Sequence, residues 1–276
     1  MFIRNRLAGF RAVMAFDNWP MLLLGRLFDR GTAFVIYRKK GLNILVDHHG
    51  GDAAGTRGCI VGDMYRRYLP SLGLSGPLRV IDLGANGGGF PLLLRLEGVE
   101  FAALVCVEMN PLTFQRMWLN VAANVGPAAV AINAAACGEG QPAEIFLTPT
   151  RGGTGESMYD LRAEASAAHV SVPTITLPYI FEKYFAGQDI DLCKIDIEGA
   201  EYEVLASTPD KLLLRIKNLI VEFHDPSRTP ALLERIRGLG FREIADKSQK
   251  TGERTEVHAF RGPAAAAASV PVPSAA

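Results

Sequence analysis

The stretch Val80-Ile81-Asp82-Leu83-Gly84-Ala85-Asn86-Gly87-Gly88-Gly89 decides the fold. An apolar, strand-like run leads into glycines, and a helical pattern follows over residues 88–96. Glycine adopts backbone angles that other residues avoid, and it lets a ligand approach the free N–H groups that begin a helix. A strand, a glycine turn and a helix in this order predict a ligand-binding α/β fold.

The spacing of the glycines separates two classes of ligand. Dinucleotides are bound by G-x-G-x-x-G, whereas here Gly84 is followed by Ala85 and Asn86, so that spacing fails. Asp82 stands just before the loop, where a carboxylate would repel a pyrophosphate but suits a ligand that carries an ammonium and a sulfonium. The loop Asp82 to Gly87 is therefore predicted to hold S-adenosylmethionine, with a nicotinamide-dependent oxidoreductase as the alternative.

Outward from the loop, short apolar runs alternate with helical stretches. This pattern predicts an α/β sheet that is largely parallel. The expected strands cover residues 78–83, 101–107, 128–135, 190–197, 218–224, 241–245 and 256–260, with helices at 88–96 and 229–237 and a short extra strand at 144–147.

Acidic side chains follow several of these strands. Glu108 ends the second strand, where an acid can accept both hydrogen bonds of a ribose diol. Asp196 and Glu198 share one side of the fourth strand, and Glu222 and His224 share one side of the fifth. Ligands lie outside the carboxyl ends of strands in open α/β sheets, so these four side chains are expected to line one cleft.

This cluster predicts the chemistry of proton removal. His224 or Asp196 is the expected base, because imidazole titrates near neutral pH, and Glu198 and Glu222 would position the base or an acceptor hydroxyl. The same carboxylates could hold a divalent cation, but their spacing is not diagnostic, so no required metal is expected.

The two ends of the chain have different compositions. Residues 1–77 are expected to form a cap that contacts substrate or a second subunit, and residues 262–276, rich in Ala and Pro, are expected to be disordered. Residues 1–40 contain eight Lys or Arg and two acids, which favours a solvated basic face over a membrane-surface helix. A homo-oligomer is left open.

The overall composition limits the partners and the compartment. The chain has 276 residues, 49% of them hydrophobic, and Lys+Arg (29) equals Asp+Glu (29). Without surplus positive charge, nucleic acid is not an expected partner. Cys59, Cys106, Cys137 and Cys193 lack the spacing of zinc or redox sites, and no run approaches the ~20 apolar residues of a membrane span, which favours a reducing cytoplasm.

Four segments resemble the FkbM methyltransferases. They are Ile81-Asp82-Leu83-Gly84-Ala85-Asn86-Gly87-Gly88, Val107-Glu108-Met109-Asn110-Pro111, Lys194-Ile195-Asp196-Ile197-Glu198-Gly199-Ala200-Glu201 and Val221-Glu222-Phe223-His224. The resemblance implies a class I methyltransferase fold over residues 78–261, with a seven-stranded sheet and a reversed last strand. It also implies O-methylation of a hydroxyl on a sugar or natural product.

The resemblance further implies roles for individual residues. Asp82, Gly84, Asn86 and Gly87 would hold the methionine part, Glu108 and the adjacent Met109 the ribose, and Ala136 and Cys137 the adenine. Cys137 departs from the valine that is frequent in the family, and Ser157 matches a serine associated with it. A scaffold that kept this fold and lost catalysis is the second alternative.

Overall fold

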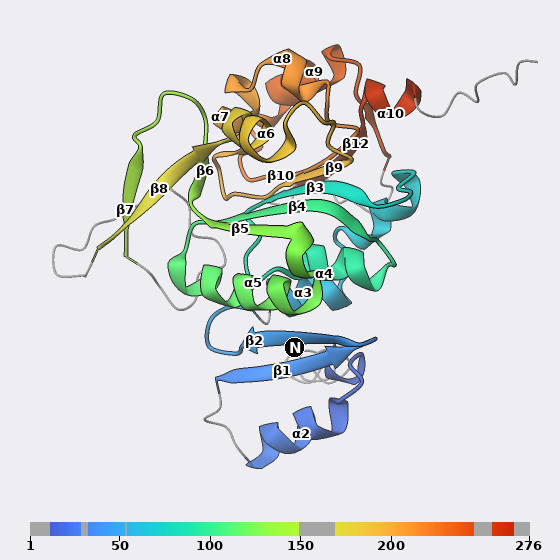
Figure 1. The fold of residues 1–276 in the computed structure, drawn as a ribbon, viewed down its shortest axis with the longest axis vertical. Helices are drawn as coiled ribbons and strands as arrows, with labels where there is room; N and C mark the ends of the chain where they lie inside the picture. Colours follow the sequence, from blue (N-terminus) through green and yellow to red (C-terminus); the bar gives the residue numbers. More distant parts are fainter. Residues whose placement is uncertain (1–11, 29–32, 53, 149–168, 246–255, 268–276) are drawn as a thin grey trace, which may run out of the picture.

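A seven-stranded sheet forms the centre of the molecule in the computed structural model, which describes residues 12–28, 33–52, 54–148, 169–245 and 256–267 (Figure 1). The strand order is β11-β12-β10-β9-β3-β4-β5. β12 runs antiparallel to β10, whereas β10, β9, β3, β4 and β5 pair in parallel. The strands are β3 (Leu78–Leu83), β4 (Phe101–Glu108), β5 (Ala129–Asn133), β9 (Leu192–Ile195), β10 (Asn218–Phe223), β11 (Arg242–Glu243) and β12 (Glu256–Arg261). This is the class I methyltransferase fold, and the predicted reversed last strand is confirmed.

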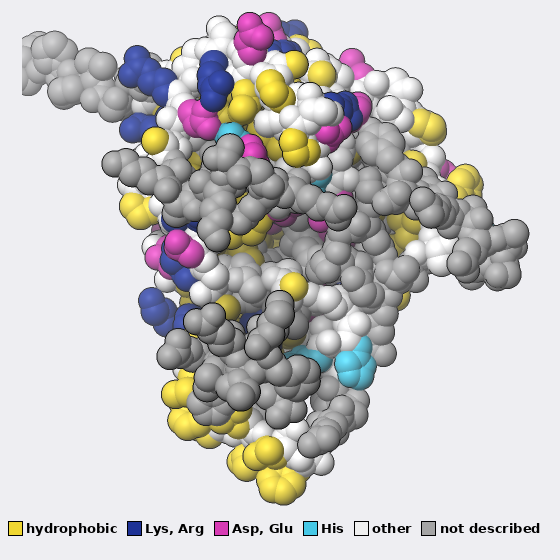
Figure 2. Space-filling model, turned by 180° about the vertical axis from the view of Figure 1, so that it is seen from behind, with side chains coloured by type: hydrophobic (Ala, Val, Ile, Leu, Met, Phe, Trp, Pro, Cys, Tyr) yellow, Lys and Arg dark blue, Asp and Glu magenta, His cyan; other side chains and the backbone are white. Residues whose placement is uncertain are grey.

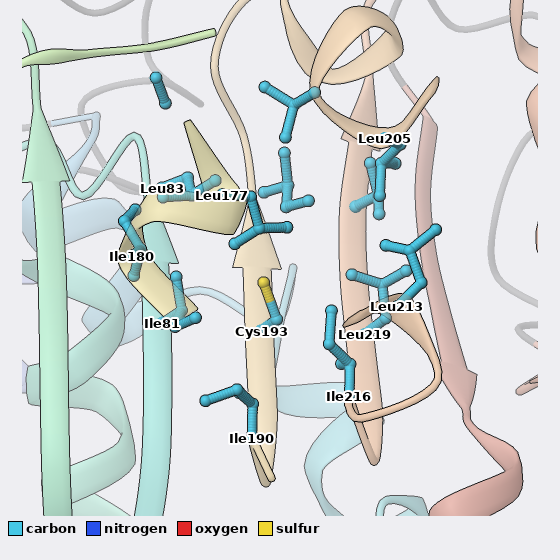
Figure 3. Close-up of a cluster of buried hydrophobic side chains, with 14 of the residues drawn as sticks. Ile81, Leu83, Leu177, Ile180, Ile190, Cys193, Leu205, Leu213, Ile216 and Leu219 are labelled. Atoms are coloured by element: carbon cyan, nitrogen blue, oxygen red, sulfur yellow. The ribbon is translucent and has the colours of Figure 1, made fainter. Parts of the chain in front are cut away.

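β3 lies in the middle of the sheet and is buried on both faces. Alternate residues of the strand therefore enter two different cores. Ile81 and Leu83 pack in the core that Figure 3 shows, beside Cys193. Leu78 and Val80 pack in the core on the other face. This double burial explains why β3 reads as an almost continuous apolar run.

Helices cover both faces of the sheet. α4 (Gly89–Leu96) and α5 (Pro111–Asn124) contribute to the core around Val80. α6 (Leu177–Phe185), α7 (Glu201–Ser207), α8 (Asp210–Leu213) and α9 (Thr229–Gly238) contribute to the core around Ile81. The result is a three-layer α/β/α arrangement (Figure 1).

The first block of the chain packs on α4 and α5. It contains α2 (Trp19–Phe28), the antiparallel pair β1 (Phe34–Lys39) and β2 (Leu42–Asp47), α3 (Thr56–Val61) and the 3-10 helix η1 (Arg66–Ser71). Asn120 of α5 bonds the backbone N–H and C=O of Leu45, and Asn124, one turn later, bonds those of Asn43. Two amides of a helix thus pair with β2 as a neighbouring strand would.

A smaller sheet lies beside the main one. It has the order β6 (Ala135–Cys137), β8 (Val170–Thr176) and β7 (Glu144–Leu147). β7 was predicted, whereas β8 was not. The third predicted strand is in fact two strands, because the chain leaves β5 at Ala134 and continues as β6.

The end of the chain needs a correction. Residues from 262 onward were expected to be disordered, but Pro263–Ala267 form the short helix α10. Gly262 N donates to Lys217 O, and Ala265 is buried, so this segment is fixed to the end of the sheet. Residues 268–276 lie outside the described ranges.

Candidate active site

The glycine loop after β3 is packed tightly against the chain that leaves β9. Gly84 has φ +74°, and a Cβ there would lie 1.7 Å from Asp196 O. Asn86 also adopts a positive φ, of 48°. A side chain at position 84 would therefore force the two strand ends apart, which explains why glycine follows the strand.

Glu108 braces the same loop from β4. Its Oε2 accepts a hydrogen bond from Asn86 N at 2.9 Å, and its Oε1 accepts one from Asn110 N at 2.9 Å. These two hydrogen bonds tie the end of β4 to the glycine loop. The structure thus places Glu108 beside the loop, as expected from the sequence.

A cavity of about 280 Å³ lies against the loop. Its lining comes from three regions of the chain. The loop contributes Gly84, Ala85 and Asn86; the ends of β9 and β10 contribute Lys194, Asp196 and Glu222; the first block contributes Gly55, Cys59, Met64 and Tyr65, among others. Part of the expected cap is therefore a wall of the site.

Tyr65 connects the first block to two acids. Its hydroxyl lies 2.7 Å from Asp196 Oδ2 and 3.1 Å from Glu222 Oε2. The phenol hydroxyl is the donor in both contacts, and a donated hydrogen bond stabilises the ionised form of the carboxylate that accepts it. Burial, followed by the charges of Asp196 and Glu222, raises the pKa of Tyr65 well above its usual value. Nothing in the sequence indicated this residue.

Glu222 is protonated more easily than an ordinary glutamate. Burial, followed by the charge of Asp196, raises the pKa of Glu222 to about 7, although His224, Lys194 and Tyr65 oppose the shift. The side chain titrates in the range where a base can both receive and release a proton near neutral pH.

His224, the residue after β10, lies among four carboxylates, three of which the sequence predicted. Nδ1 is 3.2 Å from Glu201 Oε1, and Nε2 is 3.3 Å from Glu198 Oε2, 3.8 Å from Asp196 Oδ1 and 3.9 Å from Glu222 Oε1. Burial lowers the pKa of His224, but the hydrogen bond to Glu201 and the charges of Glu198, Glu201 and Asp196 outweigh it and raise the pKa to about 9. At neutral pH His224 is therefore a cation, which argues against the expected role of base.

Asp82 requires a correction. It was expected to meet the ligand, but its side chain is 0% exposed and is absent from the cavity lining. Its Oδ1 lies 3.1 Å from Lys194 Nζ, which also reaches Asp196 Oδ2 at 3.3 Å and donates to Gly84 O at 2.7 Å. Asp82 and Asp196 raise the pKa of Lys194 against the effect of burial. Asp82 thus fixes a buried lysine that holds the loop.

Five other described residues expected to bind the cofactor are absent from the cavity lining, namely Gly87, Glu108, Met109, Ala136 and Cys137. Gly87 faces α3, since a Cβ there would lie 2.1 Å from Thr56 Oγ1. Cys137 is buried, and Met109 packs against its apolar cluster. Ala136 is buried in the core around Ile81. Ser157 lies outside the described residues.

Three of the clustered side chains could also hold a metal ion. Asp196, Glu198 and His224 offer ligand atoms that all lie within 4.8 Å of one another in the described part of the chain. A cation would have to replace the proton of His224, because only neutral imidazole is a ligand. The divalent-cation site that the sequence offered as an alternative therefore has three candidate ligands.

The sequence pattern of the methyltransferase FkbM domain matches residues 82–243, more than half of the chain. The chain belongs to this family. Three of the four segments that carried the resemblance contribute to the cavity lining, through Gly84, Ala85 and Asn86, through Lys194 and Asp196, and through Glu222. A comparison with curated proteins found no match.

Remote likenesses exist among solved structures. Precorrin-6y C5,15-methyltransferase from Geobacter metallireducens has a TM-score of 0.42 and 12% identity, over 71% of this chain and 86% of that one. The tRNA m1G37 methyltransferase of M. jannaschii has a TM-score of 0.45 and 12% identity, over 83% of this chain and 56% of that one. Among the described helices of this chain, none is long and apolar enough to cross a membrane.

Proposed function

We propose that this protein is an S-adenosylmethionine-dependent O-methyltransferase that acts on a hydroxyl of a sugar or natural product. The observation that carries the proposal is the cavity between the glycine loop and the pair Asp196 and Glu222. It lies at the carboxyl ends of β3, β9 and β10, where open α/β sheets bind their ligands. Membership of the FkbM family supports methyl transfer in general.

The residues of the cavity fit the proposed cofactor. Gly84, Ala85 and Asn86 line the cavity, and Glu108 accepts a hydrogen bond from Asn86 N behind the loop. Asp196 and Glu222 give the cavity an acidic wall, which favours a sulfonium over a pyrophosphate. They take the electrostatic role that the sequence assigned to Asp82. When bound, S-adenosylmethionine supplies an electrophilic methyl group.

The chain's own residues provide alignment and proton removal. Alignment of reacting groups can contribute about 7–11 kcal/mol, and a general base typically contributes about 10²–10⁴-fold. Glu222, with its pKa of about 7, is the proposed base, and Tyr65 bridges it to Asp196. His224 is the cation that holds Glu198, Asp196 and Glu222 in place. These roles for Glu222 and His224 reverse those expected from the sequence.

The state of the cysteines supports a proposal for the cellular compartment. Among the described residues Cys59, Cys106, Cys137 and Cys193 are free, and burial raises the pKa of Cys59 to about 12, so its thiol is unreactive. Free, inert thiols suit the reducing cytoplasm, which is part of the proposal.

A labelled-methyl screen tests the function. The full chain is mixed with S-adenosylmethionine that carries a deuterated methyl group and with hydroxylated sugars, natural products and tRNA, and the products are analysed by mass. We expect a labelled methyl ether on a small molecule, formed by the wild type and lost in Glu222→Gln. Transfer to nitrogen, carbon or tRNA would overturn the acceptor class, and binding without any transfer would favour the silent scaffold.

Two additions to the screen separate the alternatives. Activity that EDTA abolishes and Mg²⁺ restores would support the metal reading of Asp196, Glu198 and His224 over the metal-free one. A shift in NADH fluorescence on mixing with the protein would favour the nicotinamide oxidoreductase.

A further inference from the structure

The outward face of α2 is apolar. Leu22 faces inward and is buried, whereas the large side chains on the outside run from 38% exposed at Trp19 to 84% at Phe28. The exposed set on this helix is Trp19, Met21, Leu24, Leu27 and Phe28. A helix on the surface of a soluble domain normally presents polar residues to water, so this arrangement is inverted. Figure 2 shows hydrophobic side chains gathered at the lower end of the molecule, where α2 lies.

β1 extends the apolar surface. Phe34 and Ile36 are about half exposed, whereas Tyr37, also on β1, is fully buried. A groove of about 600 Å³ separates β1 from α2. Its lining includes Met21, Arg26, Phe34, Ile36, Arg38 and His49, and none of the described residues that line it is an acid. We call α2, β1 and this groove the α2–β1 face.

The charges around the α2–β1 face are positive. Arg26 and Arg38 line the groove, and Lys39 and Lys40 follow on β1 and its turn. The nearby acids are engaged elsewhere: Asp17 Oδ2 accepts from Lys40 N, and buried Asp47 lies 3.9 Å from Arg116. Burial lowers the pKa of His48, so the positive charge of the groove comes from its arginines.

Two kinds of occupant could cover an apolar face. A second copy in a twofold dimer would place the same patch against itself, because such contacts are isologous. Arg26 and Arg38 of each copy would then face a groove whose described lining residues offer no acid as a partner. An anionic lipid surface, in contrast, is complementary both to the exposed apolar side chains and to the basic residues Arg26 and Arg38.

We propose that the α2–β1 face docks this protein on bilayers that contain anionic phospholipid. α2 would lie in the plane of the interface, with Leu24 and Leu27 toward the acyl chains and Trp19 at headgroup level. Arg26 and Arg38 contact lipid phosphates. This placement does not depend on the proposed enzymatic function, since it uses no residue of the cavity beside the glycine loop.

Vesicle co-sedimentation of the full chain tests the proposal. One set of vesicles contains phosphatidylcholine alone, and the other contains phosphatidylcholine and phosphatidylglycerol at a ratio of about 7:3. We expect the wild type to sediment with the mixed vesicles and to be released by salt. Leu24→Glu/Leu27→Glu and Arg26→Glu/Arg38→Glu should each weaken partitioning by about tenfold or more. Leu119→Glu, a change of an exposed leucine on α5, should have no effect.

Several results would overturn the proposal. They are absence of wild-type binding to the mixed vesicles, equal binding to both vesicle types, and full binding by either double variant with an unchanged unfolding temperature. Sedimentation velocity adds a further one. A wild-type dimer that Leu24→Glu/Leu27→Glu dissociates, with no vesicle binding, would assign the face to a second copy.

Discussion

Tyr65 is the residue whose role depends most on the three-dimensional arrangement. Its hydroxyl contacts Asp196 and Glu222 from the residue that precedes the 3-10 helix η1 of the first block. Tyr65→Phe removes a hydrogen bond that lowers the pKa of Glu222, so the acid limb of the pH–rate profile should move to higher pH and turnover should fall about tenfold or more. Tyr68→Phe is the matched control, because its hydroxyl donates to Val257 O. An identical pH profile in both variants would remove Tyr65 from the mechanism.

The pH dependence of turnover tests the roles of Glu222 and His224. A base with a pKa of about 7 must be deprotonated, so the rate should rise as the pH increases through about 7. The cation at His224 is lost at a pKa of about 9, so the rate should fall again above that pH. Glu222→Gln should abolish the rising limb. A rising limb that survives this substitution would assign the base to another group.

Residue-scale prediction from the sequence succeeded where a pattern exists. The alternation along two adjacent strands predicted that Asp196, Glu198, Glu222 and His224 line one cleft. His224 lies within 3.9 Å of the other three, but only Asp196 and Glu222 line the cavity. It could not reveal Tyr65, a single aromatic that is 131 residues from Asp196 in the sequence. It also could not reveal the ion pair between buried Asp82 and Lys194, since neither feature leaves a local pattern.

At the scale of elements, Asn120 of α5 links β2 to the glycine loop. Its side chain pairs with Leu45, and its Nδ2 also donates to Gly87 O at 2.8 Å. Asn120→Ala should cost about 1–3 kcal/mol of unfolding free energy and weaken S-adenosylmethionine binding, because buried polar groups lose partners and the loop loses a support. Chemical unfolding and calorimetric titration measure the two effects.

Asn124→Ala provides the comparison for this element. Asn124 makes the same pair of bonds to Asn43 but none to the loop, and the site is exposed. It should lower stability slightly and leave cofactor affinity unchanged. Equal losses of affinity in both variants would mean that the loop does not depend on Asn120.

The elements themselves were predicted best where apolar runs are sharp. β3 and β7 have the predicted bounds, and β12 differs by one residue. β8 and α6 lie between the third and fourth predicted strands and were missed, and the pairing of β8 with β6 and β7 is non-local. A strand held by distant partners cannot be recognised from its own alternation.

At the scale of the whole molecule, the first block and the core form one unit. Arg116 of α5 makes a two-pronged pair with buried Asp52, at 2.7 and 3.0 Å. We expect a single cooperative unfolding transition in calorimetry, and Arg116→Leu should lose about 3–5 kcal/mol because it leaves a buried charge unpaired. Arg237→Leu, which breaks a more exposed pair with Glu243, should change much less. Two separate transitions in the wild type would instead mean that the first block unfolds independently of the core.

The central claim is that the cavity beside the glycine loop binds S-adenosylmethionine. Calorimetric titration of the full chain with S-adenosylmethionine tests it most directly. We predict one site in the wild type, an affinity lower by about 10–100-fold in Glu108→Ala, and no change in Glu97→Ala, a surface control. A folded wild type that gives no binding, or a Glu108→Ala variant that binds as tightly as the wild type, would contradict the claim.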